Sequence, residues 1–124
     1  METLPREERL RGRKLIDRIF REGSRGAAGK AAARALANSE GRNRLAAMAG
    51  KALGGAVKRS RMRRRIRAAW REQKGRLPLG WDVALLARPG LLEAKWQDVR
   101  RDVILAAERS IRDASGQGRR PRRP

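Results

Sequence analysis

The chain has 124 residues with 33 Lys or Arg and 13 Asp or Glu, a formal net charge of +20 that opposes compaction and favours polyanionic partners. Cys and His are absent, which excludes disulfides, thiolate nucleophiles, imidazole bases and the usual zinc ligands. No apolar run reaches the roughly 18 to 20 residues that cross a bilayer, and the N-terminus lacks the apolar centre of a secretory signal. We therefore expect no membrane partner and a cytoplasmic location.

The first predicted element is a helix over residues 13–22. Its apolar face consists of Leu15, Ile16, Ile19 and Phe20. Gly23 offers a stop for this helix. A shorter turn of helix is expected before it, because Pro5 suits a first helical position.

Residues 26–53 are rich in Ala and contain no β-branched residue, so intrinsic propensity favours helix over strand. Within them, the polar and Gly-containing stretch Asn38 to Asn43 closes a hairpin as readily as it separates two helices. The local sequence therefore leaves the secondary structure of this segment open.

A second, strongly basic helix is predicted over residues 56–74. Its apolar stripe consists of Met62, Ile66, Ala69 and Trp70. Seven of the ten residues from Lys58 to Arg67 are Lys or Arg, and so many like charges on a helix destabilise it unless an anion relieves them. Because guanidinium binds phosphate bidentately and stacks on bases, this helix predicts binding to nucleic acid.

The C-terminal part predicts one strand and one helix. A continuous apolar run, Trp81 to Ala87, reads as a buried strand ended by Arg88-Pro89-Gly90. Apolar residues at helical spacing then predict a helix over residues 93–113. Residues 114–124 are rich in Gly, Pro and Arg and are expected to form a disordered basic tail, which leaves residues 1–113 as a single domain.

Features typical of a catalytic protein are weak in this sequence. Gly50 to Val57 is only superficially similar to a phosphate-cradling loop, because Ala52 stands where Ser or Thr would bind magnesium, and a tight turn into the helix is favoured. Most carboxylates are spaced to pair with Arg along a helix, and Asp82 is interpreted as a structural hydrogen-bond partner. The Trp residues, which we assign to the core, are Trp70, Trp81 and Trp96.

The segment Gly54 to Arg67 resembles the ribonuclease P protein motif Gly-Asn-Ala-Val, then Arg-Asn-Arg, then a hydrophobic residue and Lys-Arg-Arg. The match is gapless, and the similarity extends over roughly residues 4–112. This resemblance implies an α+β fold, a small two-layer α/β sandwich. Its four-stranded sheet would be accompanied by an N-terminal helix, the basic helix in a left-handed βαβ crossover, and a C-terminal helix. It also implies strands over residues 30–37 and 44–53, against the helix propensity there.

The resemblance implies a specific function as well. In this family a catalytic RNA uses magnesium to remove the 5′ leader of precursor tRNA, while the protein binds that RNA and the leader. We accordingly expect no catalytic side chain, no metal bound by the protein and no obligate protein partner. The alternative is a ribosome-associated or general RNA-binding and annealing protein with no enzymatic role.

The candidate site residues follow from the motif and from the outward face of the basic helix. The predicted RNA-binding residues are Lys51, Lys58, Arg59, Ser60, Arg61, Arg63, Arg64, Arg67, Arg71 and Arg88. Ser60 stands where the family has Asn. The family's leader cleft carries aromatic residues, and the positions that we match to it are Phe20, Ala35 and Ala47, of which only Phe20 can stack on a base.

Overall fold

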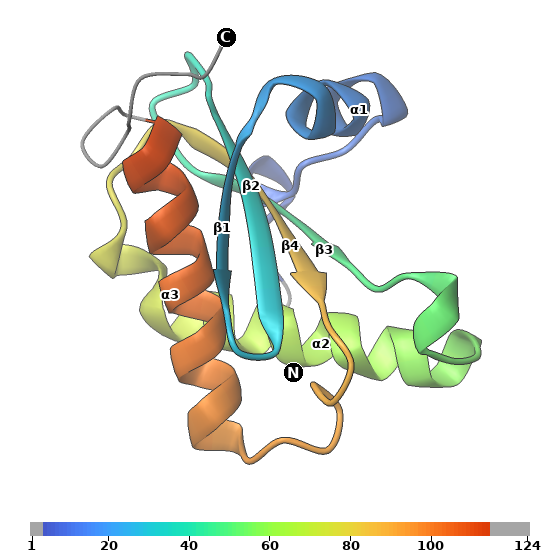
Figure 1. Ribbon diagram of the computed structural model, residues 1–124. Helices are drawn as coiled ribbons and strands as arrows, with labels where there is room; N and C mark the ends of the chain where they lie inside the picture. The colour runs from blue at the N-terminus through green and yellow to red at the C-terminus, as the bar shows by residue number, and fades with distance from the viewer. Residues whose placement is uncertain (1–3, 115–124) are drawn as a thin grey trace, which may run out of the picture.

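A computed structural model describes residues 4–114 and places them in a four-stranded sheet with three α-helices (Figure 1). In chain order the elements are α1 (Arg13–Glu22), β1 (Ser24–Ala28), β2 (Ala31–Ala37), β3 (Arg44–Met48), α2 (Ala56–Gln73), β4 (Trp81–Ala87) and α3 (Trp96–Ala114). Short 3-10 turns lie at Arg6–Glu8, Lys51–Leu53 and Lys74–Arg76. The predicted basic tail, residues 114–124, lies outside the described residues except for Ala114.

The sheet is mixed, with the strand order β1-β2-β4-β3. β2 pairs antiparallel with both β1 and β4, whereas β3 pairs parallel with β4. A parallel pair needs a long crossover, and α2 supplies it. Because β3 and β4 run in the same direction, the segments that follow them leave the sheet at the same end.

The Ala-rich strands are decided by packing rather than by propensity. On β2, Ala31, Ala33 and Ala35 are buried and alternate with partly exposed residues, which is the period of a strand. Their small side chains let α3 approach the sheet closely. At Gly26 the backbone of the helix lies directly against the strand, because a Cβ there would lie 2.4 Å from both the Ala106 carbonyl oxygen and the Ser110 amide nitrogen. The helix propensity of this segment therefore gives way to burial against α3.

Several predicted boundaries are corrected by the structure. The strand expected over residues 44–53 ends at Met48, and a 3-10 turn follows at Lys51–Leu53. The helix expected from residue 93 begins at Trp96, because the chain is still turning after Gly90 and the Lys95 carbonyl accepts the amides of Asp98 and Val99. The sequence pattern does not predict the bounds of β1, which the structure places at Ser24–Ala28.

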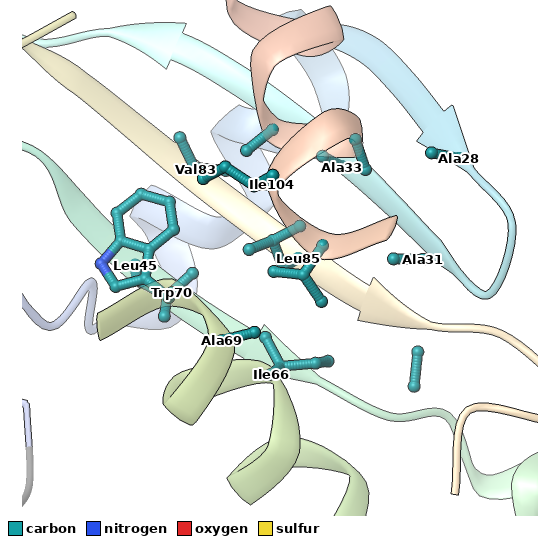
Figure 2. Packing of buried hydrophobic residues seen from close by; sticks show 14 of the residues in the cluster. Ala28, Ala31, Ala33, Leu45, Ile66, Ala69, Trp70, Val83, Leu85 and Ile104 are labelled. Carbon is teal, nitrogen blue, oxygen red and sulfur yellow. The ribbon is translucent and has the colours of Figure 1, made fainter. Parts of the chain in front are cut away.

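Each face of the sheet carries a hydrophobic cluster. The larger one joins the inner faces of α2 and α3 to the sheet, and Figure 2 shows Trp70, Ile66 and Ile104 converging on Val83 and Leu85. On the opposite face, Leu10 and Ile19 pack with Ala46 and Ala84. The core assignment of the three Trp residues is confirmed, since Trp70 is fully buried and Trp81 and Trp96 pack partly buried against the larger cluster.

Asp82 has the structural role predicted for it. Its two carboxylate oxygens accept hydrogen bonds from Nε and Nη2 of Arg44 at 2.7 and 2.8 Å, and Oδ1 also accepts from Asn38 Nδ2 at 2.8 Å. The hydrogen bonding of Arg44 to the Asp82 carboxylate raises the pKa of Arg44. The charge-assisted bidentate pair joins β3 to β4, and Asn38 adds the residue that follows β2, all at one end of the sheet.

Among the described residues, none of the helices combines the length and the apolar composition that a membrane span requires.

The close contact at Gly26 generates a stability prediction. Gly26→Ala should lower the free energy of unfolding by about 1 to 3 kcal/mol, because the new methyl group forces α3 away from β1. Urea-induced unfolding followed by circular dichroism measures this change. The matched control is Gly75→Ala, where a Cβ meets nothing within 4 Å. An equal loss in the two variants would contradict the packing explanation.

Candidate nucleic-acid interface

The apolar stripe of α2 determines which of its cations face outward. Met62, Ile66 and Trp70 are buried beneath the helix, so most of the basic residues project away from the sheet. The exposed predicted site residues of α2 are Lys58, Arg61, Arg64 and Arg67, and the partly buried ones are Arg59, Ser60, Arg63 and Arg71. The structure therefore brings the basic motif together on the outward side of one helix.

Two arginines of α2 have structural contacts that the charge pattern does not reveal. Arg59 Nε donates to the Gly54 carbonyl at 3.1 Å and so holds the turn that leads into the helix. Arg65 Nη1 donates to the carbonyls of Leu91 and Leu92 at 2.7 and 2.8 Å, and its guanidinium lies 5.8 Å from the centroid of the Trp96 ring. Arg65 thus joins α2 to the segment that precedes α3.

The outward face of α2 is left with uncompensated positive charge. The one acidic residue of this helix, Glu72, lies in its last turn and pairs with Arg100 of α3 at 2.6 Å. Although Arg67 is exposed, partial desolvation by its neighbours lowers its pKa, and the nearby charges of Arg63, Arg9 and Arg64 lower it further. An anion bound at this face would relieve the repulsion among these side chains.

Lys51 and Arg88 extend the basic surface beyond α2. Both side chains are exposed. They follow the parallel neighbours β3 and β4, so they leave the sheet at the same end, where α2 begins. The two outlying residues of the predicted site thus lie beside the N-terminal half of the basic helix.

The predicted leader positions on the sheet need correction. Ala35 is fully buried in the cluster beneath α3, and Ala47 packs against the same cluster, so neither side chain faces α1. Side chains alternate between the faces of a strand. The neighbouring residues therefore face α1 instead, namely Arg34 and Leu36 on β2 and Ala46 and Met48 on β3.

Arg34 and Phe20 form a contact that sequence reasoning missed. Arg34 Nη1 donates to the Phe20 carbonyl at 2.8 Å, and its guanidinium lies 5.1 Å from the centroid of the Phe20 ring. Arg25 lies directly opposite Arg34 in the β1–β2 register. Burial lowers the pKa of Arg34, and the charge of Arg25 lowers it further. The alternation of side chains along β2 was the signal that could have placed Arg34, instead of its neighbour Ala35, on the face toward α1.

The fold and this surface define a small α+β protein whose basic helix, packed on a mixed sheet, presents uncompensated arginines to a polyanion. A model of the Ribonuclease P family matches residues 4–110. The chain belongs to the ribonuclease P protein family. It is thus the protein subunit of a tRNA-processing endoribonuclease complex, a ribonucleoprotein in which it has an RNA partner.

Relatives and solved structures agree with this assignment. The ribonuclease P protein component of Roseiflexus sp. (strain RS-1) is 34% identical over 93% of this chain and 96% of the relative. That of Coprothermobacter proteolyticus is 36% identical over 73% of each. The RNase P protein from Thermotoga maritima has a TM-score of 0.72 at 27% identity and covers 81% of this chain and 96% of its own. The Staphylococcus aureus protein, with a TM-score of 0.71 at 23% identity over 83% of this chain and 97% of its own, shares the fold.

No group of three or more acidic, His or Cys side chains within residues 4–114 is arranged to hold a metal ion. The cations of the described surface suit the binding of phosphate, because guanidinium and ammonium groups supply donors and positive charge together.

A binding prediction follows for the outward face of α2. Arg64→Ala should weaken binding to a structured RNA and reduce the slope of log K against log salt by about 1, because one phosphate contact is lost. Filter-binding titrations at several salt concentrations measure this slope. Lys95→Ala, at an exposed position before α3, is the control and should leave the slope unchanged. An unaltered slope for the Arg64 variant would remove Arg64 from the contact set.

Proposed function

We propose that this chain binds the catalytic RNA of ribonuclease P through the outward face of α2, and binds the 5′ leader of precursor tRNA over the α1 face of the sheet. The RNA, with its magnesium ions, performs the hydrolysis. The chain contributes no catalytic side chain and acts in the cytoplasm, with residues 1–113 as its RNA-binding domain. The observation that carries the proposal is the exposed set of arginines on α2. The single acidic residue of this helix, Glu72, pairs with Arg100, so the positive charge of these arginines is uncompensated.

The proposed role of α2 is to neutralise and position phosphates. Arg61 and Arg64 are exposed and point away from the packed stripe, so they can reach a phosphate backbone without disturbing the core. Releasing the counterions of that backbone makes such binding strongly dependent on salt. Magnesium that the RNA would otherwise need for charge neutralisation is then partly replaced by the protein.

The proposed path of the leader runs from the end of α1 toward the start of α2. Phe20 is partly exposed at the end of α1 and lies beside Arg34, which offers a cation next to an aromatic ring. Lys51 and Arg88 lie at the other end of the strands. A single strand crossing this face would stack a base on Phe20 and place its phosphates near these cations.

Reconstitution tests the central part of the proposal. Adding the purified chain to its cognate catalytic RNA and a precursor tRNA should stimulate 5′ cleavage at low magnesium, because the protein supplies part of the positive charge. The yield of mature 5′ ends is measured on a gel. The control is the same reaction at high magnesium, where the stimulation should shrink. Absence of stimulation at low magnesium would overturn the proposal.

The RNA that is recovered with the chain from cells distinguishes the proposal from its alternative. One dominant structured RNA species is expected, whereas bulk ribosomal RNA would favour a general RNA-binding role.

A further prediction concerns the leader. Phe20→Ala should weaken the binding of a precursor with a leader by about 1 to 3 kcal/mol, the usual value of one stacked base, and leave a leaderless tRNA unaffected. Titration of the holoenzyme with both substrates measures the difference. Leu15→Ala is the matched control, because Leu15 also packs partly buried in the α1 cluster. Equal losses for the two substrates would show that Phe20 only stabilises α1.

A further inference from the structure

A groove lies between the N-terminal segment, the edge of β3 and the C-terminal half of α2. Its volume is 840 Å³. Five arginines line it, and they are Arg9, Arg11, Arg64, Arg67 and Arg71. We name it the N-terminal groove. Two of these arginines, Arg9 and Arg11, come from a part of the chain that the basic motif does not include.

The N-terminal wall of this groove is held firmly in place. Leu4 and Leu10 are only 2% and 5% exposed, so both ends of the segment are anchored in hydrophobic clusters. The amide of Leu10 donates to the Leu45 carbonyl at 2.8 Å, which continues the edge of β3. Glu8 also pairs with Lys74, just after α2. The groove is thus formed before any ligand binds, which lowers the entropic cost of binding.

The charge of the groove is unbalanced. Within residues 4–114, Arg11, Arg64 and Arg67 have no acidic partner. Arg9 donates from Nε to the Leu4 carbonyl at 2.9 Å, which orients its guanidinium without neutralising it. The charge of Arg9 contributes to lowering the pKa of Arg67, so cations of the two walls interact across the groove. Such a site favours an anion that carries several charges.

The floor of the groove is apolar rather than charged. Ile16, Ala46, Met48 and Ala68 contribute to it. The edge of β3 adds backbone polar groups, because Ala47 lies two residues beyond Leu45 and its amide and carbonyl point to the same side. A floor of this kind suits the flat face and polar edge of an unpaired base, whereas a duplex shows only its phosphates and grooves to such a cleft.

We infer that the N-terminal groove binds a single-stranded segment of RNA, with phosphates on the arginines of its two walls and one unstacked base on its apolar floor. The inference rests on the proposed function for the identity of that RNA, the catalytic RNA of ribonuclease P. The groove shares Arg64, Arg67 and Arg71 with the outward face of α2 and borders the leader face at Ala46 and Met48, whereas neither Phe20 nor Arg34 lines it. Arg9 and Arg11 become RNA-binding residues.

Competition separates the possible ligands of the groove. The probe is the change in fluorescence of a dye attached at Arg11→Cys, a unique site because the natural chain has no Cys. A single-stranded oligonucleotide should displace or quench the dye at lower concentration than a duplex with the same number of phosphates. Polyglutamate of equal charge should act more weakly than the single strand. A duplex or polyglutamate that acts as well as the single strand would overturn the inference.

Tethered cleavage identifies the segment of the catalytic RNA that the groove binds. An iron chelate attached at Arg11→Cys in the assembled holoenzyme should cut the catalytic RNA within a single-stranded segment. The matched control is Lys95→Cys, exposed before α3, which should not cut that segment. Cuts only in helical RNA, cuts only in the leader, or the same cuts from both positions would contradict the inference.

Charge variants distinguish a failure of this inference from a failure of the proposed function. Arg11→Gln should lower the salt slope for the catalytic RNA by about 0.7, as expected for one contact to a single strand. Ala68→Glu should weaken binding further, because it places a carboxylate on the floor, whereas Gln97→Glu on α3 should not. If the unaltered chain fails to stimulate cleavage, the proposed function is wrong. If it stimulates cleavage and both groove variants bind like it, only the inference is wrong.

Discussion

The packing of one apolar stripe of α2 against the sheet is the contact on which the rest of the structure depends. Ile66 and Trp70 have no exposed surface, and they anchor a helix whose other faces are almost entirely basic. Burial of these side chains offsets part of the repulsion among the arginines. It also sets the rotation of the helix, and therefore which cations face outward and which of them line the N-terminal groove.

The small side chains of the sheet have two consequences. They let α3 lie close to β1 and β2, with Gly26 beneath Ala106 and Ser110. They also bury less apolar surface per residue than Val or Ile would, so the stability of the sheet depends strongly on specific polar contacts. The pair between Arg44 and Asp82 is the clearest of these, because it joins the two parallel strands β3 and β4 at their N-terminal ends.

Arginine has several different functions in this chain, and the residue type alone does not separate them. Arg44 and Arg65 stabilise the fold through a carboxylate and through backbone carbonyls. Arg34 contacts both the carbonyl and the ring of Phe20. Arg64 and Arg67 have no acidic partner in the described part of the chain and face the proposed RNA sites. The partner of each guanidinium, rather than its place in a basic run, distinguishes structure from binding.

The sequence by itself determined the helix over residues 13–22, the basic helix and the strand Trp81–Ala87, because periodicity and turn signals are local. It also determined the RNA-binding character, since charge is a property of composition. Only the tertiary structure decided that the Ala-rich segments are strands and that Arg34, not Ala35, faces α1. Burial against α3 overrides the helix propensity of Ala, and the register of a strand is set by the partner that covers it.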